Sequence, residues 1–251
     1  MGSFLNLVAY RLPLKKSVIF PPSTCTTCNT HIKKYDNIPI ISWLLLRGRC
    51  RSCKSKISPR YLMGELGTGF LFALVSGRFH PRSTLFLIAY LFLAAVSIVL
   101  ALIDLDTRTL PNRILLPSLI FGTVILGIDG VSNGNFGALV RALIAATALL
   151  LFYFTLSIIY PGGMGMGDVK FAGLLGFFLG YLSWGALLVS TFSTFFLGGI
   201  FAISLILTRS ANRKSGIPFG PWMALGSWLG ILFSPTILHH YYALFGLINP
   251  A

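Results

Sequence analysis

The stretch that decides the fold reads STLFLIAYLFLAAVSIVLALID and covers residues 83–104. It carries no charge before its last residue, Asp104. A bilayer core of about 30 Å needs roughly 20 predominantly apolar residues per helix. The stretch is therefore long and apolar enough to cross a membrane, and it ends in a carboxylate.

Similar stretches lie on both sides of this one, and together they predict an all-α polytopic membrane protein with about seven transmembrane helices. They cover residues 61–79, 83–103, 114–128, 138–160, 169–187, 186–208 and 217–238. The third is short and the fifth and sixth are nearly continuous, which leaves a re-entrant or broken segment open at either place. GxxxG patterns at Gly176/Gly180 and Gly226/Gly230 indicate close helix packing, within the chain or between chains.

The composition excludes an ordinary soluble domain. Of the 251 residues, 10% are charged and 55% are of hydrophobic type, whereas soluble globular proteins carry about 25% charged residues. Twenty Lys and Arg residues stand against six Asp and Glu residues. A lipid bilayer is the solvent that suits such a chain.

The basic residues are concentrated near the N-terminus, since residues 11–60 hold eleven of the twenty. We therefore expect three parts in the chain. Residues 1–10 resemble the end of a first helix. They are either an interfacial anchor or the remnant of a longer helix, which would mean that the start codon was assigned too late. Residues 11–60 form a polar domain, and residues 61–251 form the transmembrane domain.

The orientation follows from the basic residues, because cytoplasmic loops retain Lys and Arg. If residues 11–60 are cytoplasmic, only Arg78, Arg82 and Arg141 fall on the opposite side. The remaining loops on the cytoplasmic side then carry Arg108, Arg113, Lys170, Arg209, Arg213 and Lys214. The sequence thus predicts a multi-pass membrane protein with its polar domain in the cytoplasm.

All four cysteines lie in the polar domain, as Cys25-x-x-Cys28 and Cys50-x-x-Cys53. Two CxxC pairs at about this spacing are typical of structural zinc held by four thiolates. Two disulfides are the alternative, which a cytoplasmic location disfavours. Positive charge near such a site often binds nucleic acid. The orientation of the chain in the membrane and contact with anionic lipid explain this charge equally well. We therefore expect zinc and membrane lipid, and no nucleic acid.

The six acidic residues narrow the search for chemistry. Asp36 lies in the polar domain, and Asp129, followed by Gly, reads as a turn residue in a loop. The other four lie in or beside apolar stretches, where an ionisable side chain is costly and is a functional candidate. These four are Glu65, Asp104, Asp106 and Asp168.

Asp104 and Asp168 both fall at cytoplasmic ends of predicted spans, so they can approach one another at the same depth. Asp168 follows four glycines between residues 162 and 167, and glycine permits close approach of another segment. The alternative is a flexible loop in which Asp168 only caps a helix. Two such carboxylates can share a proton, one acting as general base on water while the other polarises a carbonyl.

Six motifs in order resemble those of the bacterial type IV prepilin peptidases, the leader peptidases and N-methyltransferases of pilus, type II secretion and competence systems. This family belongs to the GxGD-type intramembrane aspartic proteases. The motifs are GSFLNLVAYRLP at 2–13, the paired CxxC, NIPIISWLLLRGRC at 37–50, SPRYLMGELGTG at 58–69, LIDLDTRTLPN at 102–112 and GMGMGDVK at 163–170.

The resemblance implies catalytic aspartates at Asp104 and Asp168, supported by Gly165, Gly167, Asp106 and Lys170. It implies cleavage of a basic leader from prepilins and pseudopilins at the cytoplasmic face of the bacterial inner membrane. Methylation of the new N-terminal residue by S-adenosylmethionine would follow. Asn112 stands where many bacterial members have Asp, which suggests that this position is not required for proteolysis.

Two other classes of function remain as alternatives. Intramembrane aspartates can serve an ion- or proton-coupled transporter, although the sequence has no internal repeat and its acids lie at span ends. A zinc-containing adaptor that only binds partners is the third reading, and it would not need the two aspartates.

Overall fold

The computed structural model describes residues 2–18, 24–25, 27–37, 40–80, 82–160, 162–208 and 218–246. Over these residues the regular secondary structure is helical apart from two isolated β-bridges, which confirms the predicted all-α class. It divides into two compact units, Met1–Gly77 and Arg78–Ala251. The division into 1–10, 11–60 and 61–251 stays a prediction.

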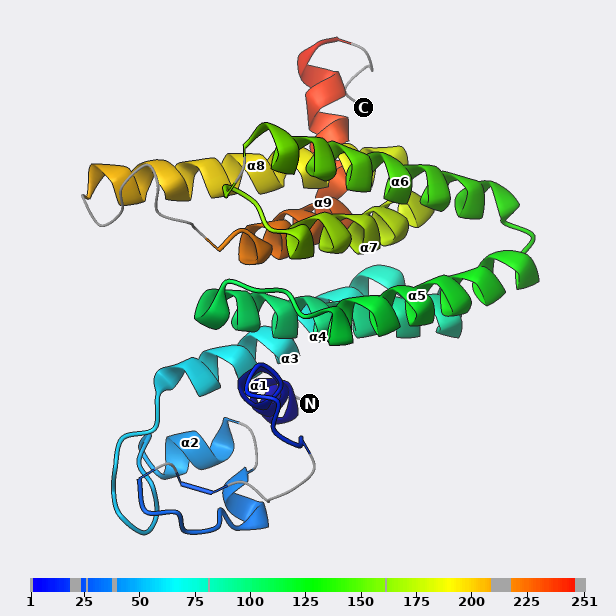
Figure 1. Cartoon of the computed structure of the whole chain (residues 1–251). Coiled ribbons are helices and arrows are strands. Elements are labelled where there is room, and N and C mark those ends of the chain that lie inside the picture. The colour runs from blue at the N-terminus through cyan, green and yellow to red at the C-terminus, as the bar shows by residue number, and fades with distance from the viewer. Residues whose placement is uncertain are drawn as a thin grey trace. The chain divides into compact units, whose positions relative to one another are not determined.

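Figure 1 shows the helices of both units, coloured in chain order. The first unit contains α1 (Gly2–Arg11), the 3-10 helix η1 (Lys34–Asn37), α2 (Ile41–Leu45) and most of α3 (Pro59–Phe79). The second contains α4 (Thr84–Thr107), α5 (Asn112–Ser132), α6 (Phe136–Ile159), α7 (Met166–Leu182), α8 (Trp184–Leu207) and α9 (Gly220–Leu244).

In the first unit, glycines let α1 pack closely on α3. A Cβ on Gly2 would lie 2.7 Å from the Cα of Glu65, and a Cβ on Gly64 would lie 2.6 Å from Oδ1 of Asn6. The Nδ2 group of Asn6 also donates to the carbonyl of Tyr61 at 3.2 Å. Within the stretch 2–13, α1 is thus a helix that packs on α3, the helix that follows the cysteines.

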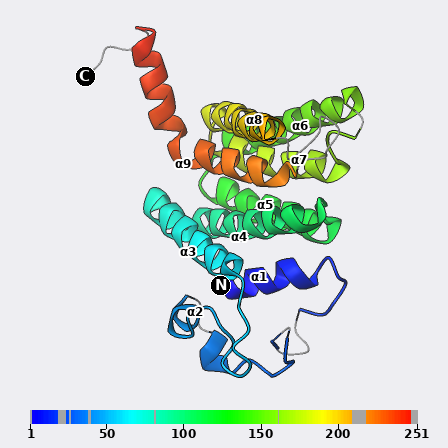
Figure 2. The same ribbon diagram turned by 90° about the vertical axis from the view of Figure 1, so that its left-hand side faces the viewer.

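In the second unit, six helices form three layers of two (Figures 1 and 2). The middle layer holds α7 and α9, with α6 and α8 on one side and α4 and α5 on the other. Residues 168–181 of α7 are almost all buried. Figure 2 also shows a sharp bend in α9, whose interior contains Pro235, a residue that removes a backbone donor from the helix.

The two GxxxG patterns pack within the chain. A Cβ on Gly176 would lie 2.8 Å from the carbonyl of Ala145 in α6. On the other pair of helices, a Cβ on Gly230 would lie 2.5 Å from the carbonyl of Ala186 in α8. The α6–α7 and α8–α9 pairs therefore approach backbone to backbone, as small residues in membrane helices allow.

Buried hydrogen bonds tie these layers together. The Tyr90 hydroxyl of α4 donates to the carbonyl of Phe178 in α7 at 2.8 Å. The Trp228 indole of α9 donates to the hydroxyl of Ser97 in α4 at 2.9 Å. Such bonds between membrane helices are worth about 0.6 kcal/mol each on average, so they mainly fix the relative rotation of the helices.

Five of the described helices are long and apolar enough to cross a membrane, namely α4, α5, α6, α8 and α9. The count of seven is therefore not confirmed. Of the other two predicted spans, α3 carries Glu65 and Arg78 within its length, and α7 has only 17 residues. Many large apolar side chains on the five helices are exposed, as expected for a surface that faces lipid.

The predicted fifth span, 169–187, is wrong at its C-terminal end. The helix stops at Leu182, because Ser183 is extended (φ −173°, ψ 161°) and starts the next helix. Its Oγ accepts the N–H of Ala186 at 3.0 Å, which is the usual N-cap bond.

The predicted short third span is instead a helix of 21 residues. The predicted loop residues Arg209, Arg213 and Lys214 lie outside the described residues.

We expect Gly226→Ala to destabilise the protein. Its Cβ would lie 2.2 Å from Oγ1 and 2.6 Å from the backbone nitrogen of Thr194. Overpacking of this kind costs about 1–3 kcal/mol, which a lowered midpoint of thermal unfolding in detergent would report. Gly199→Ala is the matched control, since nothing lies within 4 Å of its added Cβ. Equal midpoints for the two variants would contradict the close α8–α9 contact.

Candidate functional site

The four cysteines of the first unit form one cluster. Their sulfur atoms all lie within 4.8 Å of one another, and none of them forms a disulfide. The Sγ atoms of Cys25 and Cys53 are 3.8 Å apart. The cluster therefore joins both CxxC pairs in one potential metal site, as the sequence predicted.

The two CxxC pairs have the same backbone geometry. The N–H of Cys25 donates to the carbonyl of Thr30, and the N–H of Cys50 donates to the carbonyl of Ser55. Asn29 and Lys54, each four residues after the first cysteine of its pair, both adopt positive φ. Each pair is thus a tight turn that directs two sulfur atoms to one point. His31 is exposed and is not a member of this cluster.

The surroundings of Cys25 and Cys50 shift the pKa values of their thiols in opposite directions. The backbone N–H of Cys28 is the main cause that lowers the pKa of Cys25 to about 5, so this thiol is ionised at neutral pH. The backbone N–H of Cys53 lowers the pKa of Cys50, but burial and the neighbouring sulfur atoms outweigh it and the pKa is raised. A bound cation would offset this crowding of negative charge.

Asp104 lies in the last turn of α4 and is 4% exposed. Its Oδ2 accepts the backbone N–H of Gly220, the first residue of α9, at 2.9 Å. A Cβ on Gly220 would lie 2.9 Å from that same oxygen, so only glycine fits there. The carboxylate is therefore held where α4 meets the start of α9.

Asp168 lies in the first turn of α7 and is 9% exposed. Its Oδ2 accepts the N–H of Gly165, the N-cap residue of that helix, at 2.9 Å. The helix-cap reading of Asp168 is thus confirmed, but this role does not exclude a second one.

The segments that carry the two aspartates are in direct contact. A Cβ on Gly167 would lie 2.8 Å from the Cβ and 3.2 Å from the carbonyl oxygen of Leu110. Lys170 donates from Nζ to Oδ1 of Asn112 at 3.0 Å. The loop after Asp104 is therefore held against the start of α7 at Gly167 and at Lys170, which keeps the two carboxylates at one end of the helices.

The remaining acidic candidates lie elsewhere. Asp106 is exposed in the last turn of α4. Glu65, in the first unit, accepts the N–H of Ile40 through Oε2 at 2.7 Å, which is a structural bond. Gly220 is a site residue that the sequence interpretation missed, although Pro221 after it is a common signal for a helix start.

The reading of Asp129 as a loop residue is wrong. The helix α5 extends to Ser132, so Asp129 lies in its last turn and is 4% exposed. Its carboxylate accepts the hydroxyls of Ser83 and Tyr181 and the amide of Asn133. Asp129 is therefore buried and hydrogen-bonded by three side chains, at the end of the second unit opposite to Asp104.

Two family descriptions match the chain. Residues 1–79 match the bacterial peptidase A24 N-terminal domain, and residues 91–203 match the type IV leader peptidase family. A prepilin leader peptidase/N-methyltransferase of Aeromonas salmonicida is 34% identical over 268 residues, which cover 96% of this chain and 90% of the relative. The chain belongs to the type IV leader peptidase family.

Other members of the family are similar along the same length. The prepilin leader peptidase/N-methyltransferase of Bacillus subtilis is 33% identical over 244 residues, covering 96% of this chain and 93% of the relative. That of Pseudomonas aeruginosa is 30% identical, covering 96% and 89%. No solved structure matches the chain. The family assigned from the six motifs is thus confirmed, and the transporter alternative gains no support.

We expect the cysteine cluster to hold a metal ion in the purified protein. Elemental analysis should find about one metal ion per chain, because four converging sulfur ligands form a closed site. Cys50→Ser removes one ligand and should abolish stoichiometric binding, whereas Ser52→Ala, in the same turn and exposed, should not. A folded wild-type protein without metal would contradict this assignment.

Proposed function

We propose that this member of the type IV leader peptidase family is a membrane-bound aspartic peptidase that removes the leader from type IV prepilins and pseudopilins. It then methylates the new N-terminal residue. The observation that carries the peptidase assignment is the contact between the two aspartate segments, in which Gly167 lies against Leu110. The family and the printed names of its relatives support the same two activities.

Peptide hydrolysis by two carboxyl groups requires one of them to be ionised and the other to be protonated. Two aspartates in a water-poor site share one proton, because two like charges at close range are costly. The ionised partner removes a proton from water as the water attacks the scissile carbonyl, and the protonated partner donates a hydrogen bond to the carbonyl oxygen. The proton is shared by the pair and belongs to neither residue alone.

The backbone amides position this pair. Gly220 donates to Asp104 and Gly165 donates to Asp168, each through Oδ2 at 2.9 Å. Each bond fixes one oxygen and the rotation of its carboxyl group, so that the other oxygen can serve substrate and water. Gly165, Gly167 and Lys170 would then act as positioning residues, together with Asp106 at the exposed end of α4.

The orientation proposal places this catalytic end in the cytoplasm. Arg108, Arg113 and Lys170 lie at the same end as the two aspartates, whereas Arg82 and Arg141 lie at the other end of the helices. Cytoplasmic loops are enriched in Lys and Arg. A prepilin in the bacterial inner membrane would then present its leader to the aspartates at the cytoplasmic face.

The metal of the cysteine cluster is proposed to be structural zinc. Four sulfur atoms about 2.3 Å from a tetrahedral zinc ion are about 3.8 Å apart, which agrees with the 3.8 Å between Cys25 and Cys53. Four thiolates complete the coordination shell, so zinc would shape the first unit and take no part in hydrolysis. S-adenosylmethionine, expected from the family, is a second substrate that supplies the methyl group.

The dyad assignment predicts a specific pattern of losses. Asp104→Asn and Asp168→Asn should each reduce leader cleavage at least about 10³-fold, because each removes a proton-transfer group. Asp106→Asn should cost less than about tenfold, since this side chain is exposed. Cleavage is measured on a purified prepilin in detergent.

Methylation of a pre-cleaved substrate is the control for folding in the same variants. It should persist in both, because the proposed methyl transfer does not use the dyad. Leader cleavage that survives either substitution would refute the dyad, while loss of both activities in a variant with an unchanged midpoint of thermal unfolding would contradict a separate methylation site.

A further inference from the structure

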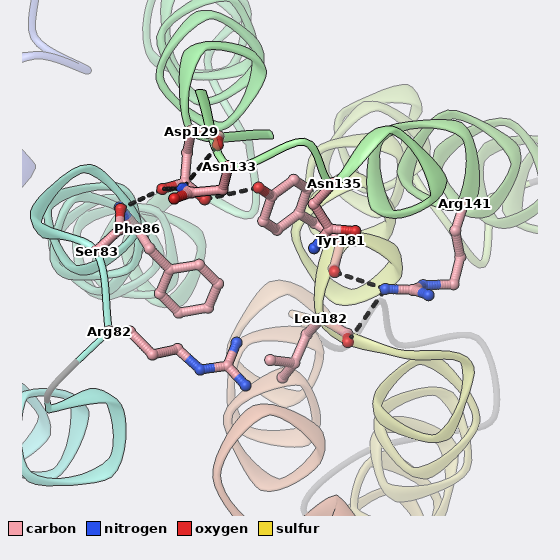
Figure 3. A pocket seen from close by; sticks show the side chains of 9 residues that line it. All are labelled: Arg82, Ser83, Phe86, Asp129, Asn133, Asn135, Arg141, Tyr181 and Leu182. Atoms are coloured by element: carbon pink, nitrogen blue, oxygen red, sulfur yellow. Dashed lines mark hydrogen bonds between the residues drawn. The ribbon is translucent and has the colours of Figure 1, made fainter. Parts of the chain in front are cut away.

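The end of the second unit opposite to the aspartates contains a polar cavity (Figure 3). Its volume is about 310 Å³, and it lies where α4 and α6 begin and α5 and α7 end. Its lining includes the polar side chains of Arg82, Ser83, Asp129, Asn133, Arg141 and Tyr181. None of them takes part in the proposed reaction, so the cavity needs its own explanation.

Asp129 builds the wall of the cavity. Tyr181 donates to its Oδ2 at 2.7 Å, and Ser83 and Asn133 donate to its Oδ1. Figure 3 shows these groups converging on the carboxylate from three helix ends. Because both oxygens already accept hydrogen bonds, Asp129 acts as a structural anchor that holds the ends of α4, α5 and α7 together.

Arg141 is held rigidly beside this anchor. Its Nε donates to the carbonyl of Gly180 at 2.6 Å, and one terminal nitrogen donates to the carbonyls of Tyr181 and Leu182 at 2.9 and 3.3 Å. These bonds satisfy the last carbonyls of α7, where a cation is favourable. The positive charge is therefore fixed at the cavity.

Arg82 supplies the second positive charge. It is exposed, and its guanidinium lies over the ring of Phe86, 4.9 Å from the centroid. A guanidinium group in a cation–π contact can still donate its N–H groups to a ligand. Within the described ranges, neither Arg82 nor Arg141 forms a salt bridge with a carboxylate.

The charge balance at the cavity favours an anion. Two arginines and one aspartate give its lining a formal charge of +1, and the negative partner already accepts three hydrogen bonds. Basic residues are scarce at this end, which has only Arg78, Arg82 and Arg141 in the predicted topology. Two of these three line one cavity. Planar guanidinium groups are well suited to phosphate oxygens.

We propose that this cavity binds the phosphate of an anionic phospholipid headgroup. Two of its walls, α5 and α6, are among the less covered helices: only 33% and 22% of their most apolar stretches are buried, against 56% for α4. Val131, Phe136 and Val140, on turns next to the cavity, are large apolar side chains that are 57–60% exposed. Acyl chains can lie along this surface while the headgroup occupies the cavity, whose volume is small for a larger ligand.

The test uses short-chain phosphatidylglycerol added to the full-length protein in nonionic detergent, with the midpoint of thermal unfolding as readout. Phosphatidylglycerol should raise the midpoint of the wild type more than phosphatidylcholine or phosphatidylethanolamine does. Arg82→Gln should weaken the apparent affinity by about tenfold or more, as expected for loss of a charge-assisted hydrogen-bond donor. Arg82→Lys, which keeps the charge but loses the planar guanidinium group, should weaken the apparent affinity less than Arg82→Gln does.

Arg47→Gln is the matched control, because it removes an arginine from an exposed position in the other unit and should respond like the wild type. Arg141→Gln is a poor test variant, since it also removes the bonds to the end of α7. An equal response to zwitterionic lipids, or an unchanged affinity in Arg82→Gln, would overturn the proposal. The same stabilisation by inorganic phosphate alone at equal concentration would also overturn it, by assigning the cavity to a free anion.

Discussion

The second unit depends on two carboxylates buried at a helix junction, each held by a glycine amide. Asp104 accepts from Gly220, and Asp168 accepts from Gly165. Burying a charge without such a partner is strongly unfavourable. The bond from Gly220 joins the end of α4 to the start of α9, whereas the bond from Gly165 fixes Asp168 at the start of its own helix α7.

Glycine gives this arrangement its close contacts. At the end that carries the two aspartates, Gly167 lies against Leu110, and Gly220 lies against Asp104 itself. Along the helices, glycines bring α7 to α6 and α9 to α8 at backbone distance. In a bilayer, where apolar surface alone does not drive helices together, close van der Waals contact is a main source of association. The same residue type thus serves both the packing and the site.

The two ends of these helices have different chemistry. One end carries the two buried carboxylates that we propose as the catalytic pair, and the other carries two arginines around a cavity. Asp129 at the second end has three side-chain donors, whereas Asp104 and Asp168 each accept a single backbone bond at 2.9 Å. A saturated carboxylate stabilises structure, and an incompletely saturated one remains able to bind water and substrate.

Much of this could be read from the sequence. Spacing alone predicted the cysteine cluster, and the position of Asp104 and Asp168 at span ends predicted their proximity. Gly220 could not be predicted in this way, because its partner is 116 residues away in the chain and no local pattern records such a contact. Asp129 was misread because a following glycine usually marks a turn, and hydropathy did not show that α5 continues beyond it. The short α7 was overestimated because Ser183, which starts α8, is flanked by apolar residues on both sides.

The central claim is that contact between the two aspartate segments creates the active site. The most direct measurement compares prepilin leader cleavage by Gly167→Ala and Gly163→Ala. A Cβ at residue 167 would meet Leu110 at 2.8 Å, whereas a Cβ at residue 163 meets nothing nearer than 3.4 Å. Small displacements in an active site cost up to about 10²-fold, so we predict a loss of about 10- to 100-fold for Gly167→Ala and little change for Gly163→Ala. Equal rates for the two variants would contradict the account.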